Sequence, residues 1–479
     1  MAETQVFLIN TNTMKPAVAP IALDYIAGAL EQAGFVARIV DLCFAENIEK
    51  TLAESLAAQD VLAVGVTFRN SDDCFWPSAM SFVPHLNRVV DAVRQLTHAP
   101  IVIGGAGFSV FPENILASCG ADYGIAGDGE IAFTRLAEAL DTGAGIEDIP
   151  GLLWRTDHGQ LRKNPPQYNG SLSLCPTRQW VDNPRYFREG GQGGVETKRG
   201  CDRRCVYCAD PLSKGARARL RDPEEVADET DALLGMGVDV LHFCDCEFNV
   251  PHRHALAVCE ALIRRGLGRK VRWYTYAAIT DFSPELARRM REAGCVGVNF
   301  GADSAVDDML STYGRRHRRN DIAVAVGLCK EHGLRVMLDL LLGGPGETEE
   351  TLRETIEFMK SIDPDCVGAA LGVRVYPGTR FFKHLLGQGC LEKNPNLHRA
   401  RGEWPDGDLL RPTFYIAEAL GERPARLVKD IIGGDKRFFE PVDAQGLENY
   451  NYNDNQPLVE AIRNGARGAY WDILLRMRA

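Results

Sequence analysis

Three cysteines spaced C-x3-C-x2-C, namely Cys201, Cys205 and Cys208, constrain this chain more than any other feature. They directly follow a short β-type run at residues 195–198. Three thiolates on one loop are soft ligands that suit zinc or an iron–sulfur cluster. Structural zinc usually takes four ligands, and the sequence holds no second C-x2-C pair. Three cysteines instead leave one iron of a [4Fe-4S] cluster open to an outside ligand, which favours a catalytic cluster.

Composition and charge limit the classes of protein to which the chain can belong. Its 479 residues are enough for about two to three domains with buried cores. A net charge of −11 argues against a general nucleic-acid binder, and no apolar run reaches membrane-spanning length. The 14 cysteines follow an N-terminus without a signal-peptide pattern, which points to reduced thiols. We therefore expect a cytoplasmic protein with no membrane span and no nucleic-acid partner.

In residues 1–145, short β-type runs alternate with amphipathic helical stretches. The predicted strands are residues 5–10, 37–42, 61–68, 101–107 and 121–126. This alternation predicts a doubly wound, Rossmann-like parallel sheet, whose ligands bind beyond the carboxyl ends of the strands. Two glycine-rich turns fall at those ends, and glycine lets the backbone approach a bulky ligand closely. Their candidate binding residues are Gly104, Gly105, Ser109, Gly127, Gly129 and Glu130.

A second series of strands and helices begins at the cysteine loop. Its predicted strands are residues 195–198, 240–248, 271–279, 296–302, 335–342 and 366–375. In barrels built from such units, chemistry sits at the carboxyl ends of the strands. Conspicuous motifs follow four of these strands, and we expect them to form a site together with the cysteines.

The cysteine spacing, with the aromatic Tyr207 just before the third cysteine, resembles that of the radical S-adenosylmethionine (SAM) enzymes. The six strand–helix units likewise resemble the partial (β/α)6 barrel of that family. The resemblance implies that Cys201, Cys205 and Cys208 hold a [4Fe-4S] cluster whose open iron binds SAM. It also implies that the reduced cluster cleaves SAM to a 5′-deoxyadenosyl radical.

The motifs at the strand ends strengthen this resemblance. In the family, Glu247 would hold the SAM amino group and Asp303 its ribose or carboxylate, although the family's usual residue at the latter position is glutamate. The glycines around Gly344 would make room for adenosine, and the segment that begins at Arg374 is typical of cobalamin-dependent members. The SAM-site residues that the resemblance implies are Tyr207, Glu247, Asp303, Ser304, Gly344 and Arg374.

The N-terminal domain resembles the cobalamin-binding domain of class B radical SAM enzymes. Residues 20–30, 104–115 and 121–130 carry the likeness. The D-x-H-x-x-G motif, whose histidine ligates cobalt in many other cobalamin proteins, is absent. The loop with Arg69 and Asn70 is then the place for a residue that covers the lower cobalt face, and we favour Arg69. The alternative is an empty flavodoxin-like domain in which the glycines are ordinary turn residues.

Together these features predict an α/β chain with four parts. They are a Rossmann-like cobalamin-binding domain (residues 1–145), a linker (146–194), a partial TIM-barrel radical SAM domain (195–390) and a small helical, substrate-capping region (391–479). The resemblance implies C-methylation of an unactivated carbon through methylcobalamin and a 5′-deoxyadenosyl radical. Cyclisation, ring contraction or oxidation with the same cofactors is the alternative. The expected partners are a small-molecule or peptide substrate and an electron donor such as flavodoxin or ferredoxin.

Two other interpretations of the cysteines carry less weight. Cys244 and Cys246 could ligate an auxiliary cluster, but no further cysteine pair lies nearby in the sequence, which favours positions on a buried strand. Methylthiolation of tRNA would need three more cluster cysteines in the N-terminal domain. Cys43, Cys74 and Cys119 are too scattered to supply them.

Overall fold

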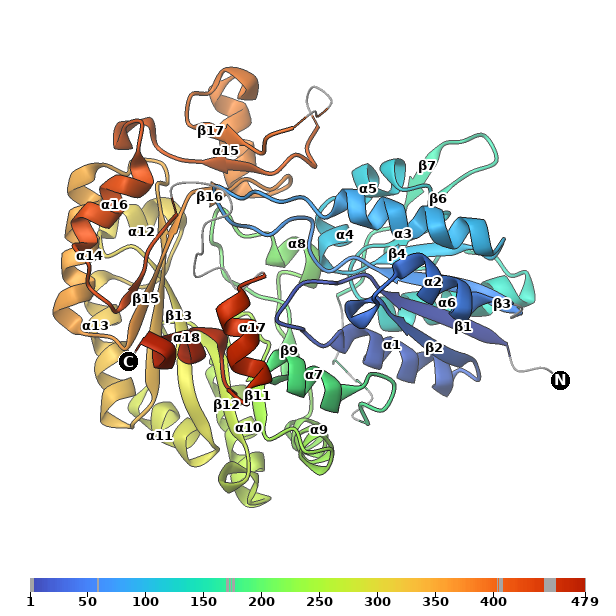
Figure 1. Ribbon diagram of the computed structural model, residues 1–479, viewed down its shortest axis with the longest axis horizontal. Coiled ribbons are helices and arrows are strands. Elements are labelled where there is room, and N and C mark those ends of the chain that lie inside the picture. Colours follow the sequence, from blue (N-terminus) through green and yellow to red (C-terminus); the bar gives the residue numbers. More distant parts are fainter. Residues whose placement is uncertain are drawn as a thin grey trace.

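The computed structural model describes residues 4–57, 60–168, 172, 174, 177–402, 404, 408–442 and 454–478. Two sheets of seven strands each dominate it. The N-terminal sheet, in blue and cyan, lies to the right in Figure 1, and the second sheet, in green to orange, lies to the left. Within the described residues, no helix is long and apolar enough to cross a membrane.

The N-terminal sheet has the predicted doubly wound form. Its strands run in the order β2-β1-β3-β4-β5-β6-β7, and the first five are parallel. The antiparallel hairpin of β6 and β7 lies within the predicted linker, so this sheet extends past residue 145. The strands are β1 Gln5–Asn10, β2 Val36–Asp41, β3 Val61–Thr67, β4 Ile101–Gly104, β5 Tyr123–Ile125, β6 Leu152–Arg155 and β7 Leu161–Lys163.

Helices cover both faces of this sheet because successive strand residues point to opposite sides. Val6 and Leu8 of β1 pack with helices α1 and α6, whereas Phe7 and Ile9 face helices α2 and α3. The helices are α1 Ile21–Gln32, α2 Ile48–Leu56, α3 Val83–Leu96, α4 Ala106–Val110, α5 Pro112–Ser118 and α6 Gly129–Thr142.

The second sheet is entirely parallel and forms the predicted partial barrel. Its order is β19-β15-β14-β13-β12-β11-β8, so a short strand near the C-terminus adds a seventh member beside β15. The strands are β8 Gly193–Val195, β11 Val240–Phe243, β12 Arg272–Ala277, β13 Cys295–Asp303, β14 Arg335–Leu342, β15 Cys366–Leu371 and β19 Phe438–Phe439. The helices on its outer face are α9 Pro223–Gly235, α10 His252–Arg264, α11 Pro284–Glu292, α12 Asp307–Tyr313, α13 Arg319–Glu331 and α14 Glu349–Ile362.

Two C-terminal helices, α17 (Gln456–Arg463) and α18 (Tyr470–Arg478), close the amino end of the barrel (Figure 1). Trp471 of α18 is buried against Gly297, where an added Cβ would lie 2.9 Å from the indole. The hydroxyl of Tyr274 donates to Asp472 at 2.7 Å. The barrel lumen is therefore closed at this end, and its other end faces the N-terminal domain.

The remaining elements connect these parts. Besides the expected helices, the C-terminal region contributes an antiparallel sheet of order β16-β18-β17. These elements are α7 Asn183–Gly190, β9 Lys198–Arg199, α8 Asp210–Lys214, β10 Arg219–Leu220, β16 Val373–Arg374, α15 Arg380–Gln388, β17 Leu397–Arg399, β18 Thr413–Tyr415 and α16 Pro424–Ile432. Short 3-10 helices occupy Leu42–Phe44, Leu267–Arg269, Leu391–Lys393 and Glu418–Leu420.

Candidate active site

The cysteine loop lies between β9 and α8, at the end of the barrel that faces the N-terminal domain (Figure 1). The thiols of Cys201, Cys205 and Cys208 are all half-buried. Burial raises the pKa of each thiol, and the charge of Cys205 raises the pKa of the other two further. The three thiols are therefore neighbours that need a positively charged partner to exist together as thiolates.

An arginine that sequence analysis did not assign supplies part of that charge. The Nη1 of Arg315 lies 3.1 Å from the Sγ of Cys205, and its Nε lies 3.4 Å from Asp303. Arg315 thus lowers the pKa of Cys205 against the dominant effect of burial. Its signal in the sequence is its place at the start of the basic run 315–319.

Tyr207, Asp303 and Glu247 gather at the same loop. The Tyr207 hydroxyl donates to Asp303 at 2.6 Å, and Asp303 adopts a positive φ of 60° at the end of β13. Burial raises the pKa of the Glu247 carboxyl, whereas the charge of Arg315 lowers it. The structure therefore brings the predicted residues of two strand ends to the cysteines.

Two other predicted SAM-site residues pack closely against protein. An added Cβ at Gly344 would lie 2.2 Å from the Tyr313 hydroxyl, so the packing of Tyr313 requires glycine there. Ser304 is fully buried, and its hydroxyl lies 3.1 Å from that of Thr355. In the loop after β14, burial raises the pKa of Glu347 to about 7, and this residue accepts a hydrogen bond from Thr351. These motif residues hold the loop in place.

Arg374 connects the two domains and also lines a cavity between them. Its Nη2 lies 2.7 Å from the carboxylate of Asp72, and both side chains are almost completely buried. Its Nη1 donates to the carbonyl of Val375 at 2.6 Å. This guanidinium therefore fixes the loop after β3 against the mouth of the barrel.

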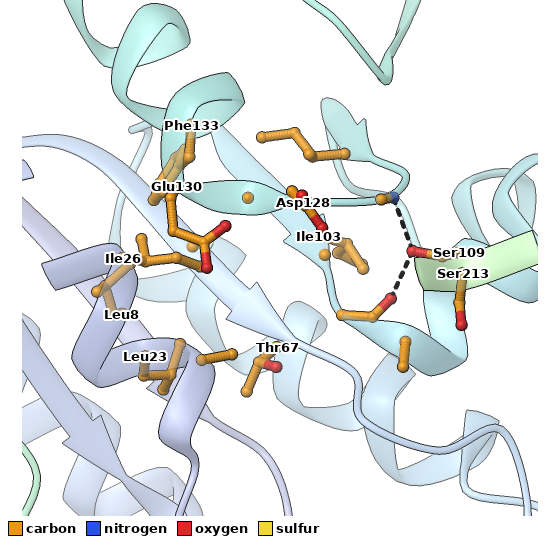
Figure 2. Close-up of a pocket in the computed structure, with 18 of the residues that line it drawn as sticks. Leu8, Leu23, Ile26, Thr67, Ile103, Ser109, Asp128, Glu130, Phe133 and Ser213 are labelled. Atoms are coloured by element: carbon orange, nitrogen blue, oxygen red, sulfur yellow. Dashed lines mark hydrogen bonds between the residues drawn. The ribbon is translucent and has the colours of Figure 1, made fainter. Parts of the chain in front are cut away.

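The glycine-rich turns of the N-terminal domain border a cavity of about 160 Å3, shown in Figure 2. Apolar side chains such as Leu8, Ile26 and Phe133 form one wall of the cavity. Ser109 joins the two turns, because its hydroxyl donates to the Gly105 carbonyl at 2.9 Å and accepts from the Gly127 amide at 2.9 Å. All six residues predicted for these turns line the cavity: Gly104, Gly105, Ser109, Gly127, Gly129 and Glu130.

Gly104 and Gly105 suit their positions at this cavity for different physical reasons. Gly105 has a φ of +107°, and an added Cβ would lie 2.6 Å from the Phe68 carbonyl oxygen, so the fold itself requires glycine there. An added Cβ at Gly104 would approach only the Ile125 carbonyl, at 3.7 Å. The backbone is therefore bare toward the cavity at Gly104, which suits a large ligand lying against it.

Acidic residues at the rim of this cavity pair with arginines of the barrel domain. Arg199 lies 3.0 Å from Glu130 and 3.1 Å from Asp128, and Arg219 also contacts Asp128. The predicted binding residue Glu130 is thus neutralised across the domain boundary. Together with Arg374 and Asp72, these pairs fix the carboxyl ends of the two sheets toward each other.

A larger cavity of about 410 Å3 lies between the two domains. From the N-terminal domain, the loop with Arg69 and Asn70 lines it, and from the barrel domain, Tyr207 and Cys208 line it. The Arg69 side chain is exposed to the cavity and has no hydrogen-bond or ion-pair partner among the described residues. Burial raises the pKa of Cys244 to about 12, and the charge of Arg69 opposes that rise, which places Arg69 over the barrel mouth.

Comparison with known proteins assigns each sheet to a class. The family model of the B12 binding domain matches residues 8–137, and that of the Radical SAM superfamily matches residues 195–359. The fold and the site thus define a radical SAM enzyme that carries a B12-binding domain.

Individual relatives show which kind of radical SAM enzyme the chain resembles. A tryptophan 2-C-methyltransferase of Streptomyces laurentii is 33% identical over 97% of this chain and 95% of its own length. The radical SAM methyltransferase TsrM from Kitasatospora setae, solved with tryptophan and the SAM analogue aza-SAM, has a TM-score of 0.91 at 29% identity and covers 99% of both chains. A second TsrM structure, with cobalamin and a [4Fe-4S] cluster, has a TM-score of 0.90 at 28% identity over 99% of this chain and 98% of its own. The chain therefore belongs to the cobalamin-dependent radical SAM methyltransferases.

This membership confirms the expected fold class and the expected C-methyl transfer, and it does not favour cyclisation, ring contraction or oxidation. The cofactors are a [4Fe-4S] cluster, SAM and cobalamin. The three thiols of one loop fit the cluster as candidate ligands, and the bare backbone at Gly104 suits cobalamin. When bound, these groups supply SAM cleavage and methyl carriage, while the protein orients and shields them.

Proposed function

We propose that this enzyme methylates a carbon of the indole ring of free tryptophan or a close analogue. The support is that a relative matching 97% of the chain is a tryptophan 2-C-methyltransferase, and that the TsrM structure with TM-score 0.91 contains tryptophan. Both cover nearly the whole chain, including the C-terminal segments that close the barrel. A free amino acid is also a small molecule, in line with the small-molecule or peptide substrate that we expected from the sequence.

The observation that carries the proposal is the cavity of about 410 Å3 between the domains. A carbon that accepts a methyl group has to reach the cobalamin domain and the SAM site at once. This cavity borders the Arg69 loop of one domain and the cysteine loop, at Tyr207 and Cys208, of the other. Its walls also include Phe75 and Trp76, whose rings can pack against an aromatic substrate. The proposed substrate therefore sits in this cavity.

The test is an anaerobic assay of the protein reconstituted with iron, sulfide and cobalamin. Free L-tryptophan and SAM with a trideuterated methyl group are supplied with a reductant, and mass spectrometry follows the products. We expect tryptophan that carries one labelled methyl group on a ring carbon. Methylation of a tryptophan-containing peptide but not of the free amino acid would contradict the proposal. The amounts of S-adenosylhomocysteine and 5′-deoxyadenosine show how SAM is used.

We also propose that Arg69 covers the lower face of cobalt in place of a histidine. Its support is the exposed, unpartnered guanidinium in the cavity that both domains share. We expect Arg69→His to introduce a coordinating nitrogen, whereas Arg69→Lys would not. Electron paramagnetic resonance of the cob(II)alamin form measures this as nitrogen hyperfine splitting. Identical spectra for the wild type and both variants would place Arg69 away from the cobalt.

We also propose that the enzyme is cytoplasmic and binds no nucleic acid. Its electrons would come from an acidic protein such as flavodoxin or ferredoxin. Exposed arginines around the cysteine loop support this choice, because Arg204, Arg316 and Arg380 form a basic region on a chain of net charge −11. Attraction between exposed charges weakens with salt. Cluster reduction by flavodoxin that is equally fast at low and high salt would contradict such docking.

A further inference from the structure

One layer of the barrel lumen is polar, and the mechanism proposed above does not use it. This layer takes one residue from each of four neighbouring strands: His242 of β11, Tyr276 of β12, Asn299 of β13 and Asp339 of β14. These residues lie on the opposite side of the sheet from the apolar residues that pack against the outer helices. Below them, Tyr274, Met337 and Trp471 belong to the apolar cluster that closes the lumen. This polar layer is therefore the floor of the space that opens toward the cysteine loop.

Side chains of this floor are walled in by protein and yet partly open to a cavity. Tyr276 is 41% exposed although it lies inside the barrel, and burial raises its pKa to about 12. The His242 and Tyr276 rings lie 5.0 Å apart, and burial lowers the pKa of His242 to about 4. His242 is therefore neutral near pH 7 and supplies no positive charge to the floor.

Asp339 has no cationic partner among the described residues. Its Oδ2 accepts one hydrogen bond from the Asn299 amide at 2.8 Å, and its Oδ1 accepts none within the described part of the chain. Burial raises the pKa of Asp339 to about 6, the Asn299 hydrogen bond lowers it, and the charge of Asp303 raises it. Asp339 is half-buried, and a carboxylate without a counter-charge attracts a cation more strongly in such a site than in water, so the folded barrel favours a ligand that brings a positive charge to this point.

A second unsatisfied acceptor lies beside this carboxylate. Asn299 is 3% exposed, and its Oδ1 has no hydrogen-bond partner. One N–H of its Nδ2 donates to Asp339, which holds the amide beside the carboxylate and leaves Oδ1 as the acceptor without a partner. Two acceptors, one of them charged, call for a small cation with several N–H donors. A primary ammonium group meets both requirements.

We propose that Asp339 and Asn299 form a subsite for the α-ammonium group of the amino-acid substrate. The inference rests on the proposed function and names how the same cavity would hold free tryptophan. Leu341 follows Asp339 by two residues on β14, so it lies on the same face one step nearer the mouth. Leu341 lines the cavity of about 410 Å3 between the two domains, together with Cys208 and Ala370. The ammonium at the floor therefore directs the ring of the substrate toward the mouth, where the two domains meet.

The test compares three indole ligands on the holoenzyme by isothermal titration calorimetry. L-tryptophan and tryptamine carry the ammonium group, whereas indole-3-propionate lacks it. We expect the near-isosteric variant Asp339→Asn to weaken binding of the first two by about 30-fold or more, because a buried charge pair is lost. Binding of indole-3-propionate should change less than about twofold, because that ligand does not use the charge.

Variants and controls separate the possible outcomes. Asn299→Ala should also weaken only the ammonium ligands, and it tests the subsite if Asp339→Asn does not fold. Asp308→Asn, on exposed α12, removes the same charge outside the barrel and should leave all three affinities unchanged. Equal losses for all three ligands, or none, would overturn the subsite alone. A wild-type holoenzyme that binds none of them would overturn the proposed substrate as well.

Discussion

Replacing Cys205 with alanine is expected to abolish methyl transfer, with a loss of at least about a thousandfold, because the cofactors carry the difficult chemistry. Cys205 is the thiol that Arg315 contacts at 3.1 Å, so its removal takes away a candidate cluster ligand and leaves a buried arginine without that partner. Iron and sulfide analysis with a UV–visible spectrum measures the cluster. The labelled-methyl assay measures turnover, and cobalamin content should remain, because the glycine-rich turns that are candidates to hold cobalamin belong to the N-terminal domain.

Two further cysteine variants make this prediction specific. Cys390→Ala changes an exposed thiol beyond α15, and it should keep both the iron content and the activity. Cys246→Ala tests whether Cys244 and Cys246, which follow β11, hold a cluster. The Cys246 Sγ lies 3.8 Å from Lys214, and burial raises the pKa of this thiol. Loss of iron from Cys246→Ala, or a full iron complement in Cys205→Ala, would contradict a ligand set of Cys201, Cys205 and Cys208.

The features that could be predicted from the sequence are those that depend on short segments of the chain. Strand and helix alternation was sufficient for both sheets because hydrophobic period and turn residues are local signals. The cysteine spacing was equally local. The glycine turns around Gly104 and Gly127 could be placed together because the carboxyl ends of parallel strands share one edge of the sheet, and the structure brings them to one cavity.

What the sequence could not predict depends on contacts between distant residues. The ion pair of Arg374 could not be foreseen, because its partner Asp72 is 302 residues away and in the other domain. The packing of Tyr313 of helix α12 against Gly344 likewise joins segments that are distant in the sequence. Asp339 and Asn299 carried no motif at all, because an unpaired acceptor in a barrel lumen is visible only when the lumen and its partners are known.

The same long-range kind of contact holds the two domains together at a second point, around Arg178. Its Nε lies 2.7 Å from Asp24 of α1, and its Nη1 lies 2.8 Å from Glu229 of α9. Its other donors reach the Gly194 carbonyl at 2.7 Å and Asn183 at 2.9 Å. All three charged side chains are completely buried. An arginine of the segment between the domains thus bridges a helix of each, and the shared cavity depends on that arrangement.

Arg178→Met should therefore destabilise the protein by about 3–5 kcal/mol, because it keeps the side-chain volume and leaves the buried carboxylate of Asp24 with its charge uncompensated, whereas Glu229 keeps its pair with Arg221. Urea denaturation of the full chain, followed by circular dichroism, measures the loss. Arg463→Met removes a half-exposed arginine from a pair with Glu189 at 3.2 Å, and it should leave the denaturation curve unchanged because exposed pairs contribute little. If both variants denature like the wild type, Arg178 does not lock the domains. If only Arg178→Met is destabilised, its methyl transfer should also be lost at lower urea concentrations than that of Arg463→Met. The reason is that the shared cavity needs both domains in place.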